Sequence, residues 1–212
     1  MHMPMHIPAT DEPVWYVAYG SNLSRERFRA YLEGGRPVGS RRHYPGSRDV
    51  AQPRQHRVLR LPGRLGFTGT STVWGGGLAF LDPDGDGEVV ARAYLLTFGQ
   101  FSDVVSQESH RDAGRDLERG ADGRLGTFSR VYDTILELEP HDGLPVMTMT
   151  ARPGSTGPPV APAAPYLATI LAGLADGCGL DAEARADYLL QARGVAPAWD
   201  RAGLLALDGA RP

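Results

Sequence analysis

The stretch WYVAYGSNLSRERFRAYL, residues 15–32, joins two different local patterns. Val14–Ala18 is rich in Trp, Tyr and Val, which favour a β-strand, whereas Leu23–Leu32 places apolar residues at helical spacing. Between them stand Tyr19-Gly20-Ser21-Asn22, and either Asn22 or Ser24 is a suitable helix cap. Four small or polar residues at a strand-to-helix junction predict either a plain turn or a binding loop.

The totals indicate a soluble globular chain. Its 212 residues fit one domain, and a net charge of −3 gives no general attraction to nucleic acid or to an anionic membrane. No apolar run approaches the roughly 18 residues of a membrane span, and residues 1–13 lack the pattern of a signal peptide. Cys178 is the only cysteine, which excludes disulfides within the chain and predicts a cytoplasmic protein.

The basic residues are unusual, since all 22 are arginine and the chain contains no lysine. This excludes a Schiff base on the protein, a lysine general base and the lysine of a phosphate-binding P-loop. Together with the high content of Ala, Gly and Pro, it suggests a GC-rich bacterial genome.

Apolar patterns and turn residues predict an α+β protein, with strands dominating the first two thirds and helices the end. We expect strands at 14–18, 58–61, 67–73, 78–81, 89–96, 132–138 and 145–150, and helices at 23–32, 100–110, 166–175 and 182–192. The expected organisation is a flexible N-terminal tail (1–13), one domain (14–196) containing an Arg/Pro-rich insert (36–64), and a C-terminal tail (197–212).

Two glycine-containing motifs are weak functional signals. DPDGDGE at 82–88 begins like a calcium loop, but position 12 of such a loop would be Ala93 instead of glutamate, so we interpret it as a hairpin turn between the flanking strands. Gly75-Gly76-Gly77 has no lysine after it and leads into a strand, which favours a close backbone approach or a bulge over a phosphate cradle.

Other candidate sites are set against structural interpretations. The insert 36–64 holds eight arginines and a single acid, but only one aromatic residue, so a solvated loop is favoured over an RNA-binding or acidic-partner surface. Ser21 and Cys178 lie in no recognised nucleophile motif. The six histidines show no metal-ligand spacing, which argues against a zinc hydrolase or zinc deacetylase and predicts no metal site.

Glu108, in SQESHR (106–111), lies near the end of a predicted helix whose other face is apolar. Taken alone, a solvated glutamate at a helix end is the simpler interpretation. Its position in the order of the other motifs favours a functional role.

Read in order, YVAYGSNL (16–23), WGGGLAFL (74–81), the QE pair at 107–108 and PAAPYLATILAGLADGCGLDAEARADYL (162–189) resemble the γ-glutamyl cyclotransferase (AIG2-like) family. The resemblance implies a small mixed, barrel-like sheet with flanking helices. It also implies that Tyr19, Gly20, Ser21, Asn22 and Leu23 form a substrate-binding loop, that Glu108 is the catalytic acid and base, and that Tyr166 belongs to the binding pocket.

Two features depart from the family pattern. Val104-Val105-Ser106 and Glu108-Ser109-His110 replace the usual Leu-Asp before, and Glu-Gly at, the catalytic position, and the insert 36–64 is longer than expected. These departures bear on the identity of the substrate more than on the chemistry.

The reaction that the resemblance implies is an intramolecular aminolysis, in which the α-amine of a γ-glutamyl compound attacks its own γ-carbonyl and releases 5-oxoproline, as in glutathione-related metabolism. One carboxylate can accept a proton and later return it, and no cofactor is needed. The expected partner is a small γ-glutamyl molecule, with the protein a monomer or homodimer. Acyl transfer or amide hydrolysis in the same pocket, and a non-catalytic metabolite-binding module, are the alternatives.

Overall fold

A computed structural model gives the fold, and it describes residues 6–37, 42–126, 129, 131–152 and 154–210. Residues 1–5 and 211–212 of the expected tails, and 38–41 of the insert, lie outside the described residues. The elements are β1 (Pro13–Ala18), the 3₁₀ turn η1 (Ser21–Leu23), α1 (Arg25–Glu33), β2 (His56–Pro62), β3 (Arg64–Thr68), β4 (Leu78–Asp82), β5 (Glu88–Thr97), α2 (Phe98–Glu108), β6 (Thr134–His141), β7 (Leu144–Thr150), α3 (Ala164–Ala175), α4 (Ala182–Gln191) and α5 (Arg201–Gly209).

The main sheet has five strands in the order β2-β5-β1-β7-β6. The central strand β1 pairs antiparallel with β5 and parallel with β7, so that Trp15 lies opposite both Leu95 and Val146. This mixed sheet with flanking helices confirms the α+β prediction. None of the described helices is long and apolar enough to cross a membrane.

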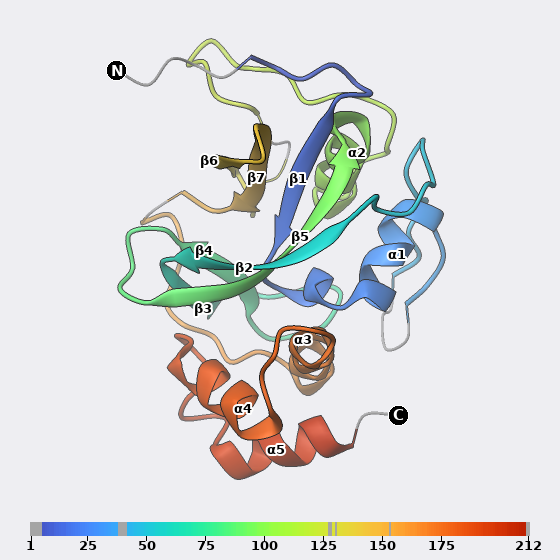
Figure 1. Cartoon of the computed structure of the whole chain (residues 1–212). Coiled ribbons are helices and arrows are strands. Elements are labelled where there is room, and N and C mark those ends of the chain that lie inside the picture. Colours follow the sequence, from blue (N-terminus) through green and yellow to red (C-terminus); the bar gives the residue numbers. More distant parts are fainter. Residues whose placement is uncertain (1–5, 38–41, 127–128, 130, 153, 211–212) are drawn as a thin grey trace.

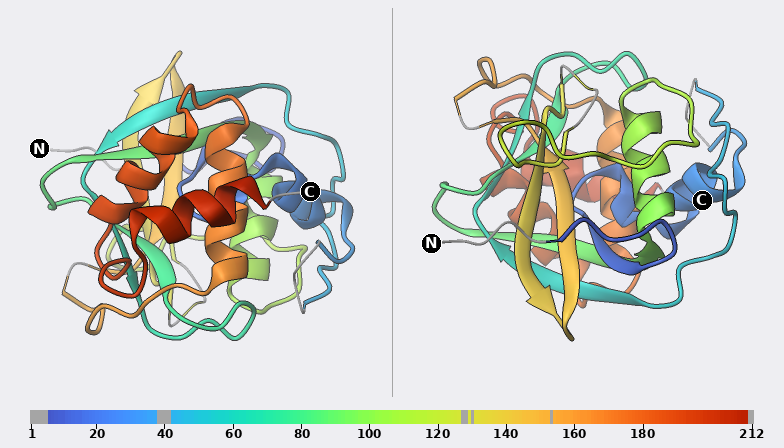
Figure 2. Two further views of the ribbon diagram at one scale, coloured as in Figure 1. Left: turned by 90° about the horizontal axis from the view of Figure 1, so that it is seen from below. Right: turned by 90° about the horizontal axis from the view of Figure 1, so that it is seen from above.

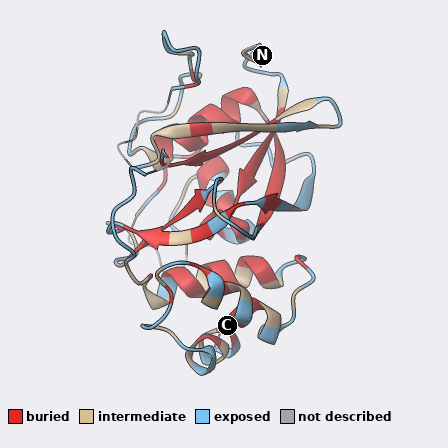
Figure 3. Ribbon diagram, turned by 90° about the vertical axis from the view of Figure 1, so that its left-hand side faces the viewer, coloured by how far each residue is buried: buried red, intermediate tan, exposed pale blue. Residues whose placement is uncertain are grey.

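Both faces of β1 are buried, because side chains alternate along a strand and helices cover each side (Figure 2). Trp15 and Val17 belong to the core shared with α3, α4 and α5. Val14 and Tyr16 belong to the second core, which includes side chains of α1 and α2. In Figure 3 the buried residues accordingly gather in the sheet and in the helices next to it.

The segment DPDGDGE does not form the hairpin turn that we expected. β4 pairs with β3, and β5 pairs with β2. Because β2 runs on into β3 and β4 into β5, the two long strands form one ribbon, and residues 83–87 bulge out of it opposite Gly63. The prediction was wrong because Gly- and Asp-rich composition suits a bulge as well as a hairpin. The ribbon turns instead through residues 69–77, which include positions 69–73 that we expected in a strand.

The ribbon bends at Gly63, which has a φ of 130°. A Cβ atom there would lie 2.6 Å from the Asp82 carbonyl oxygen, so glycine is required by both conformation and space. Beyond the bend, the β3–β4 sheet curls toward β7, where the Thr150 hydroxyl donates a hydrogen bond of 2.7 Å to the Leu81 carbonyl (Figure 1). This closure gives the sheets the barrel-like form that the family resemblance implies.

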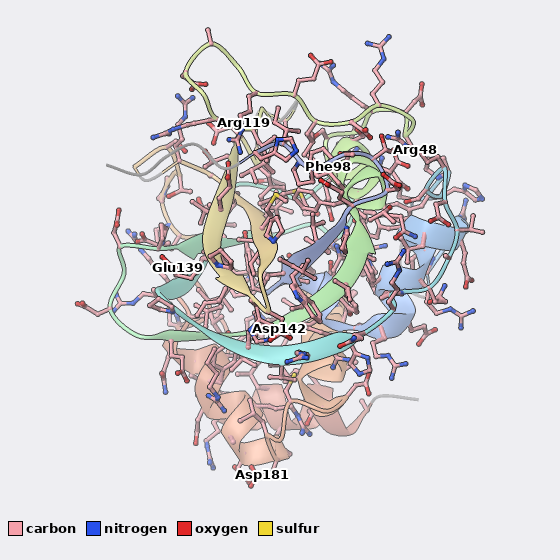
Figure 4. The ribbon with its side chains drawn as sticks, turned by 45° about the horizontal axis from the view of Figure 1, so that its top comes forward. Arg48, Phe98, Arg119, Glu139, Asp142 and Asp181 are labelled. Carbon is pink, nitrogen blue, oxygen red and sulfur yellow. The ribbon has the colours of Figure 1, made fainter. Side chains whose placement is uncertain are left out.

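Local signals in the sequence place several element ends correctly. Ser24 caps α1 by accepting a hydrogen bond from Arg27 N at 3.3 Å, and Asp181 caps α4 in the same way. The strands expected at 132–138 and 145–150 are present as the β6–β7 hairpin. Its turn residues, Asp142 and Gly143, have φ values of 52° and 75°, and Asp142 lies at the hairpin tip toward β2 (Figure 4).

The two expected tails are more ordered than predicted. Residues 201–209 form α5, which begins at the cap residue Asp200 and buries Leu204 in the core with α3 and α4. The helix was missed because it is short and follows a proline-containing segment. At the other end, the backbone oxygens of Thr10 and Glu12 accept hydrogen bonds from the start of α2.

Candidate active site

A cavity of about 310 Å³ lies where the end of β1, η1 and α1 meet the end of α2. Its walls also include residues of the 70–74 loop, β7 and α3. The described side chains and backbone that line it include Tyr16, Tyr19, Gly20, Ser21, Asn22, Arg27, Arg42, Tyr44, Tyr31, Trp74, Glu108, Tyr132 and Tyr166.

The loop Tyr19–Asn22 forms one wall of this cavity, and hydrogen bonds to neighbouring elements hold it in place. The Tyr19 hydroxyl donates to the Met149 carbonyl at 2.6 Å, which ties the loop to β7. The Asn22 side-chain amide donates to the Tyr16 hydroxyl at 3.0 Å, and the Tyr94 hydroxyl donates to the Asn22 carbonyl at 2.8 Å. These buried hydrogen bonds fix the loop before any ligand binds.

Gly20 leaves room for a neighbouring tyrosine. A Cβ atom on Gly20 would lie 3.1 Å from the Tyr166 hydroxyl, which itself accepts a hydrogen bond of 3.3 Å from Ala79 N.

The next two residues, Ser21 and Asn22, are buried, and within the described chain their backbone N–H groups have no acceptor. The loop thus contains two backbone donors without acceptors, in residues that line the cavity, and such donors suit an anionic oxygen.

Glu108 is the last residue of α2 and is half-buried. Its Oε1 atom accepts hydrogen bonds from the Tyr31 hydroxyl and, at 3.3 Å, from the Asn22 side-chain amide. Its Oε2 atom has no donor among the residues that the structure describes. One carboxylate oxygen is thus held by the protein while the other is left for a ligand.

Tyrosine hydroxyls surround this carboxylate, and burial keeps them protonated. Burial is the main cause that raises the pKa of Tyr16 and of Tyr31 well above 10.0, and the negative charge of Glu108 adds to the effect in both cases. Burial likewise raises the pKa of Tyr166 to about 12. At neutral pH these groups are therefore hydrogen-bond donors to Glu108 or to a ligand.

Arg27 comes from α1 and is 4% exposed. Its guanidinium carbon lies 4.5 Å from the centre of the Tyr44 ring and 5.3 Å from that of Trp74. Its Nη2 atom donates to the hydroxyls of Tyr44 and Tyr31, the latter at 3.4 Å. Because Tyr31 and Arg27 are four residues apart on one helix, they reach the cavity together.

The glycine run at 75–77 brings two backbone segments close together. A Cβ atom on Gly77 would lie 2.2 Å from the Val160 carbonyl oxygen, and one on Gly76 would lie 2.5 Å from the Ala161 carbonyl oxygen. This confirms the expected close backbone approach. It also positions the loop that carries Trp74 at the cavity.

The structure brings most of the expected site residues to one cavity: Tyr19, Gly20, Ser21, Asn22, Tyr166 and Glu108 all line it. Leu23 does not; it is fully buried in the core, where it packs against Gly173 of α3. Within the described chain no hydrogen bond joins the Ser21 hydroxyl to a histidine, aspartate or glutamate, so it contacts no general base. Cys178 is buried next to Arg92 and lies outside the lining of the cavity.

Sequence reasoning missed much of the wall, including Tyr16, Arg27, Tyr31, Tyr44 and Tyr132. Tyr31 belongs to the stretch 23–32, whose apolar spacing predicts packing in the core, and it is buried there; its hydroxyl nevertheless reaches Glu108. The spacing of Arg27 and Tyr31 on that helix was the available signal. The described residues include no group of three or more His, Cys, Asp or Glu that could hold a metal ion.

Comparisons with known proteins support the fold more strongly than any one activity. No protein-family model matches the chain. A curated relative, histone deacetylase 5 of Arabidopsis thaliana, is 28% identical over 198 residues, which cover 83% of this chain. The chain spans only 30% of that relative's length.

Two solved structures are similar over most of their length. A gamma-glutamyl cyclotransferase aligns with a TM-score of 0.56 at 16% identity, covering 86% of this chain and 89% of that one. An uncharacterized protein from Homo sapiens aligns with a TM-score of 0.53 at 18% identity and the same coverage. The chain therefore has the γ-glutamyl cyclotransferase-like fold that its motifs led us to expect.

Proposed function

We propose that the protein is a γ-glutamyl cyclotransferase-like enzyme that converts a γ-glutamyl amide into 5-oxoproline and a free amine, with Glu108 as general acid and base. The observation that carries the proposal is the state of the Glu108 carboxylate. Tyr31 and Asn22 hold Oε1, while Oε2 has no partner in the described chain and shares one cavity with the Tyr19–Asn22 loop.

The proposed reaction closes a five-membered ring within one molecule. The α-amine nitrogen bonds to the γ-carbonyl carbon, and the bond from that carbon to the leaving nitrogen breaks. Glu108 accepts a proton from the α-amine and returns a proton to the leaving nitrogen, so no external proton donor is consumed. Because nucleophile and electrophile belong to one substrate, the site mainly has to hold the reactive conformer.

Each part of the cavity has a role in this scheme. The backbone N–H groups of Ser21 and Asn22 bind the substrate α-carboxylate or the oxyanion that develops at the γ-carbonyl. Gly20 lets the Tyr166 hydroxyl approach the loop. The tyrosine hydroxyls stay protonated near neutral pH and therefore donate to the substrate or to Glu108.

The test is the formation of 5-oxoproline from a panel of γ-glutamyl amines and γ-glutamyl amino acids. We expect Glu108→Gln to lower kcat by about 10²- to 10⁴-fold, the usual contribution of a general acid–base group. Glu139→Gln is the matched control, because Glu139 is exposed in β6 and lies outside the cavity lining. Unchanged activity in Glu108→Gln would refute the assigned mechanism.

Product analysis separates this proposal from its alternatives. An acyl transferase or an amide hydrolase would give an acylated acceptor or free glutamate, which mass spectrometry distinguishes from 5-oxoproline. A binding module would be stabilised by γ-glutamyl ligands without turnover. The name of the Arabidopsis protein does not support a deacetylase activity for this chain, which spans only 30% of that protein's length.

A further inference from the structure

His110 is an ionisable residue of the cavity wall and follows Glu108 by two positions. It is exposed as well as part of the lining, which places it at the mouth of the cavity. The charges of Glu108 and Arg42, which also line the cavity, both act on the pKa of His110, so its ring lies near them. Within the described chain the ring has no hydrogen-bond partner and is therefore available to a ligand.

The backbone at His110 has a conformation that favours glycine. Its φ is 56°, and the other described non-glycine residue with a positive φ is Asp142, in a hairpin turn. His110 is the second residue after α2, where helices commonly end with a left-handed glycine. Backbone hydrogen bonds of 3.1 Å from His110 N to the Gln107 carbonyl and of 2.9 Å from Arg111 N to the Ser106 carbonyl hold this turn without the ring. A larger residue held in this conformation at a cavity is a pointer to function.

The His110 ring is mainly uncharged at neutral pH and can accept a proton. Burial is the main cause that lowers its pKa below 6.5, and Arg42, from the segment before β2, lowers the pKa further. Glu108 acts in the opposite direction, and these two are the charged groups of the described chain that act on the ring. A neutral imidazole with a nitrogen lone pair thus lies near the carboxylate that we assign to proton transfer.

The proposed cyclisation requires two protons to leave one nitrogen atom. The α-amine of the substrate is protonated near neutral pH, since the pKa of such an amine is about 8 or higher. One proton must leave this ammonium group before the nitrogen can attack, and a second must leave as the ring closes. A carboxylate that acts as a base accepts one proton, so a second acceptor near Glu108 allows both protons to stay in the cavity.

We propose that His110 is a second catalytic residue, which accepts the first proton from the substrate ammonium group, while Glu108 accepts the second as the α-nitrogen bonds to the γ-carbonyl carbon. This inference rests on the proposed function. Glu108 then returns its proton to the leaving nitrogen as the bond from that nitrogen to the γ-carbon breaks. The proton on His110 passes to the released amine, which leaves as an ammonium ion. Two protons leave the α-nitrogen and two reach the leaving nitrogen, so the reaction is balanced.

The variant His110→Asn tests this role, because asparagine tolerates the left-handed conformation but is not a base at these pH values. The readout is kcat/KM of the unmodified enzyme divided by kcat/KM of the variant, measured between about pH 5 and pH 10 with the best substrate of the γ-glutamyl panel. We expect this ratio to be about tenfold or more near pH 7.5, as for a general base that water partly replaces. It should fall in acid, where His110 is protonated, and approach one in alkali, where the substrate amine is already neutral.

His56→Asn is the matched control. His56 is an exposed histidine of β2 that lies outside the cavity lining, and burial also lowers its pKa. The corresponding ratio for His56→Asn should stay near one at every pH. If His110→Asn does not fold, His110→Gly suits the same left-handed backbone, and added imidazole should restore part of its activity near pH 7.5.

The result distinguishes failure of this inference from failure of the proposed function. A His110→Asn ratio that does not change with pH, whatever its size, would overturn the inference, because a merely structural role has no reason to follow these two ionisations. The cyclisation would then stand. If the unmodified enzyme forms 5-oxoproline from no compound of the panel, the proposed function is refuted and the role of His110 with it.

Discussion

Arg185 in the C-terminal helical layer and Arg27 in the cavity are both buried arginines, but their surroundings differ. Arg185 donates from Nε and Nη2 to the Asp208 carboxylate and from Nη1 to the Leu180 carbonyl, which ties α4 to α5. Arg27 faces aromatic rings and hydroxyl groups, and the negative charge of Glu108 acts on it without a direct hydrogen bond to the carboxylate. Arg185 is held by a direct ion pair, whereas Arg27 is linked to the Glu108 carboxylate only through the Tyr31 hydroxyl.

This difference separates the scaffold from the site by a physical criterion. In the helical layer the buried Arg185 is paired with Asp208, and the apolar residues are packed in the core with α3. Among the described residues, the cavity contains a guanidinium with two nitrogen atoms that lack acceptors, an open carboxylate oxygen and two backbone donors without acceptors. Substitutions in the helical layer should therefore lower mainly the free energy of unfolding, whereas substitutions at the cavity should lower mainly kcat.

The largest expected effect on stability is at Asp208. Asp208→Ala leaves the buried Arg185 without its carboxylate and should lower the free energy of unfolding by about 3 to 5 kcal/mol. Chemical denaturation measures the loss, and kcat per folded molecule should not change. The double variant Arg185→Met, Asp208→Leu, which removes both charges, should recover most of the stability. If the double variant were as unstable as the single one, the charge pair would not be the cause.

Gly173 is the position at which the two regions meet. A Cβ atom there would lie 2.4 Å from the backbone carbon of Leu23, so Gly173→Ala must push α3 away from the loop. Overpacking of this kind lowers stability by typically about 1 to 3 kcal/mol, and the displaced loop should also lower kcat. Gly209→Ala is the control, because an added Cβ in α5 meets nothing within 4 Å. A loss of stability with unchanged kcat would show that the loop tolerates the shift.

Tyr31→Phe should change activity more than stability. It removes the donor to Glu108 Oε1, so we expect kcat to fall roughly tenfold, about the value of one hydrogen bond to a charged group. Tyr132→Phe is the matched control, since the Tyr132 hydroxyl donates to the Ala79 carbonyl instead of the carboxylate. Steady-state kinetics measure the loss of kcat in both variants. Equal losses would contradict the role of Tyr31.

The smallest effect belongs to the exposed pair of Asp133 and Arg152. Burial alone would raise the pKa of Asp133, but hydrogen bonds from Arg152 N and its guanidinium hold the pKa below 3.8. Because the folded pKa lies below the unfolded value, the contribution is present above about pH 4 and is lost as pH falls through the folded pKa. Asp133→Asn should therefore cost up to about 1 kcal/mol at neutral pH. Urea titrations should show that difference shrinking in acid.

The fold could be predicted from the sequence where the signals were local. β1, the cap of α1 and the β6–β7 hairpin follow from strand propensity, a capping serine and an Asp-Gly turn. The partner of a strand is not a local property, which is why residues 82–88 were assigned to the wrong connection. The helix α5 lacked a long apolar period, and its burial depends on contacts with α3 and α4.

The candidate site divides in the same way. The loop and Glu108 were identified from motifs in order along the chain, and the structure places both at one cavity. Arg27, Tyr44 and Tyr132 were missed because they come from separate segments that only the folded chain brings together. Leu23 shows the opposite case, a residue of the motif that does not line the cavity. It lies in the core and supports the loop there.

The tie between the Tyr19 hydroxyl and Met149, 130 residues away, has a consequence for synthesis on the ribosome. The loop Tyr19–Asn22 emerges among the first residues, but its supports at Glu108, Met149 and Gly173 emerge much later. Contacts between such distant positions form slowly. During synthesis the loop Tyr19–Asn22 thus lacks these supports until α3 has been made, so the cavity is completed late.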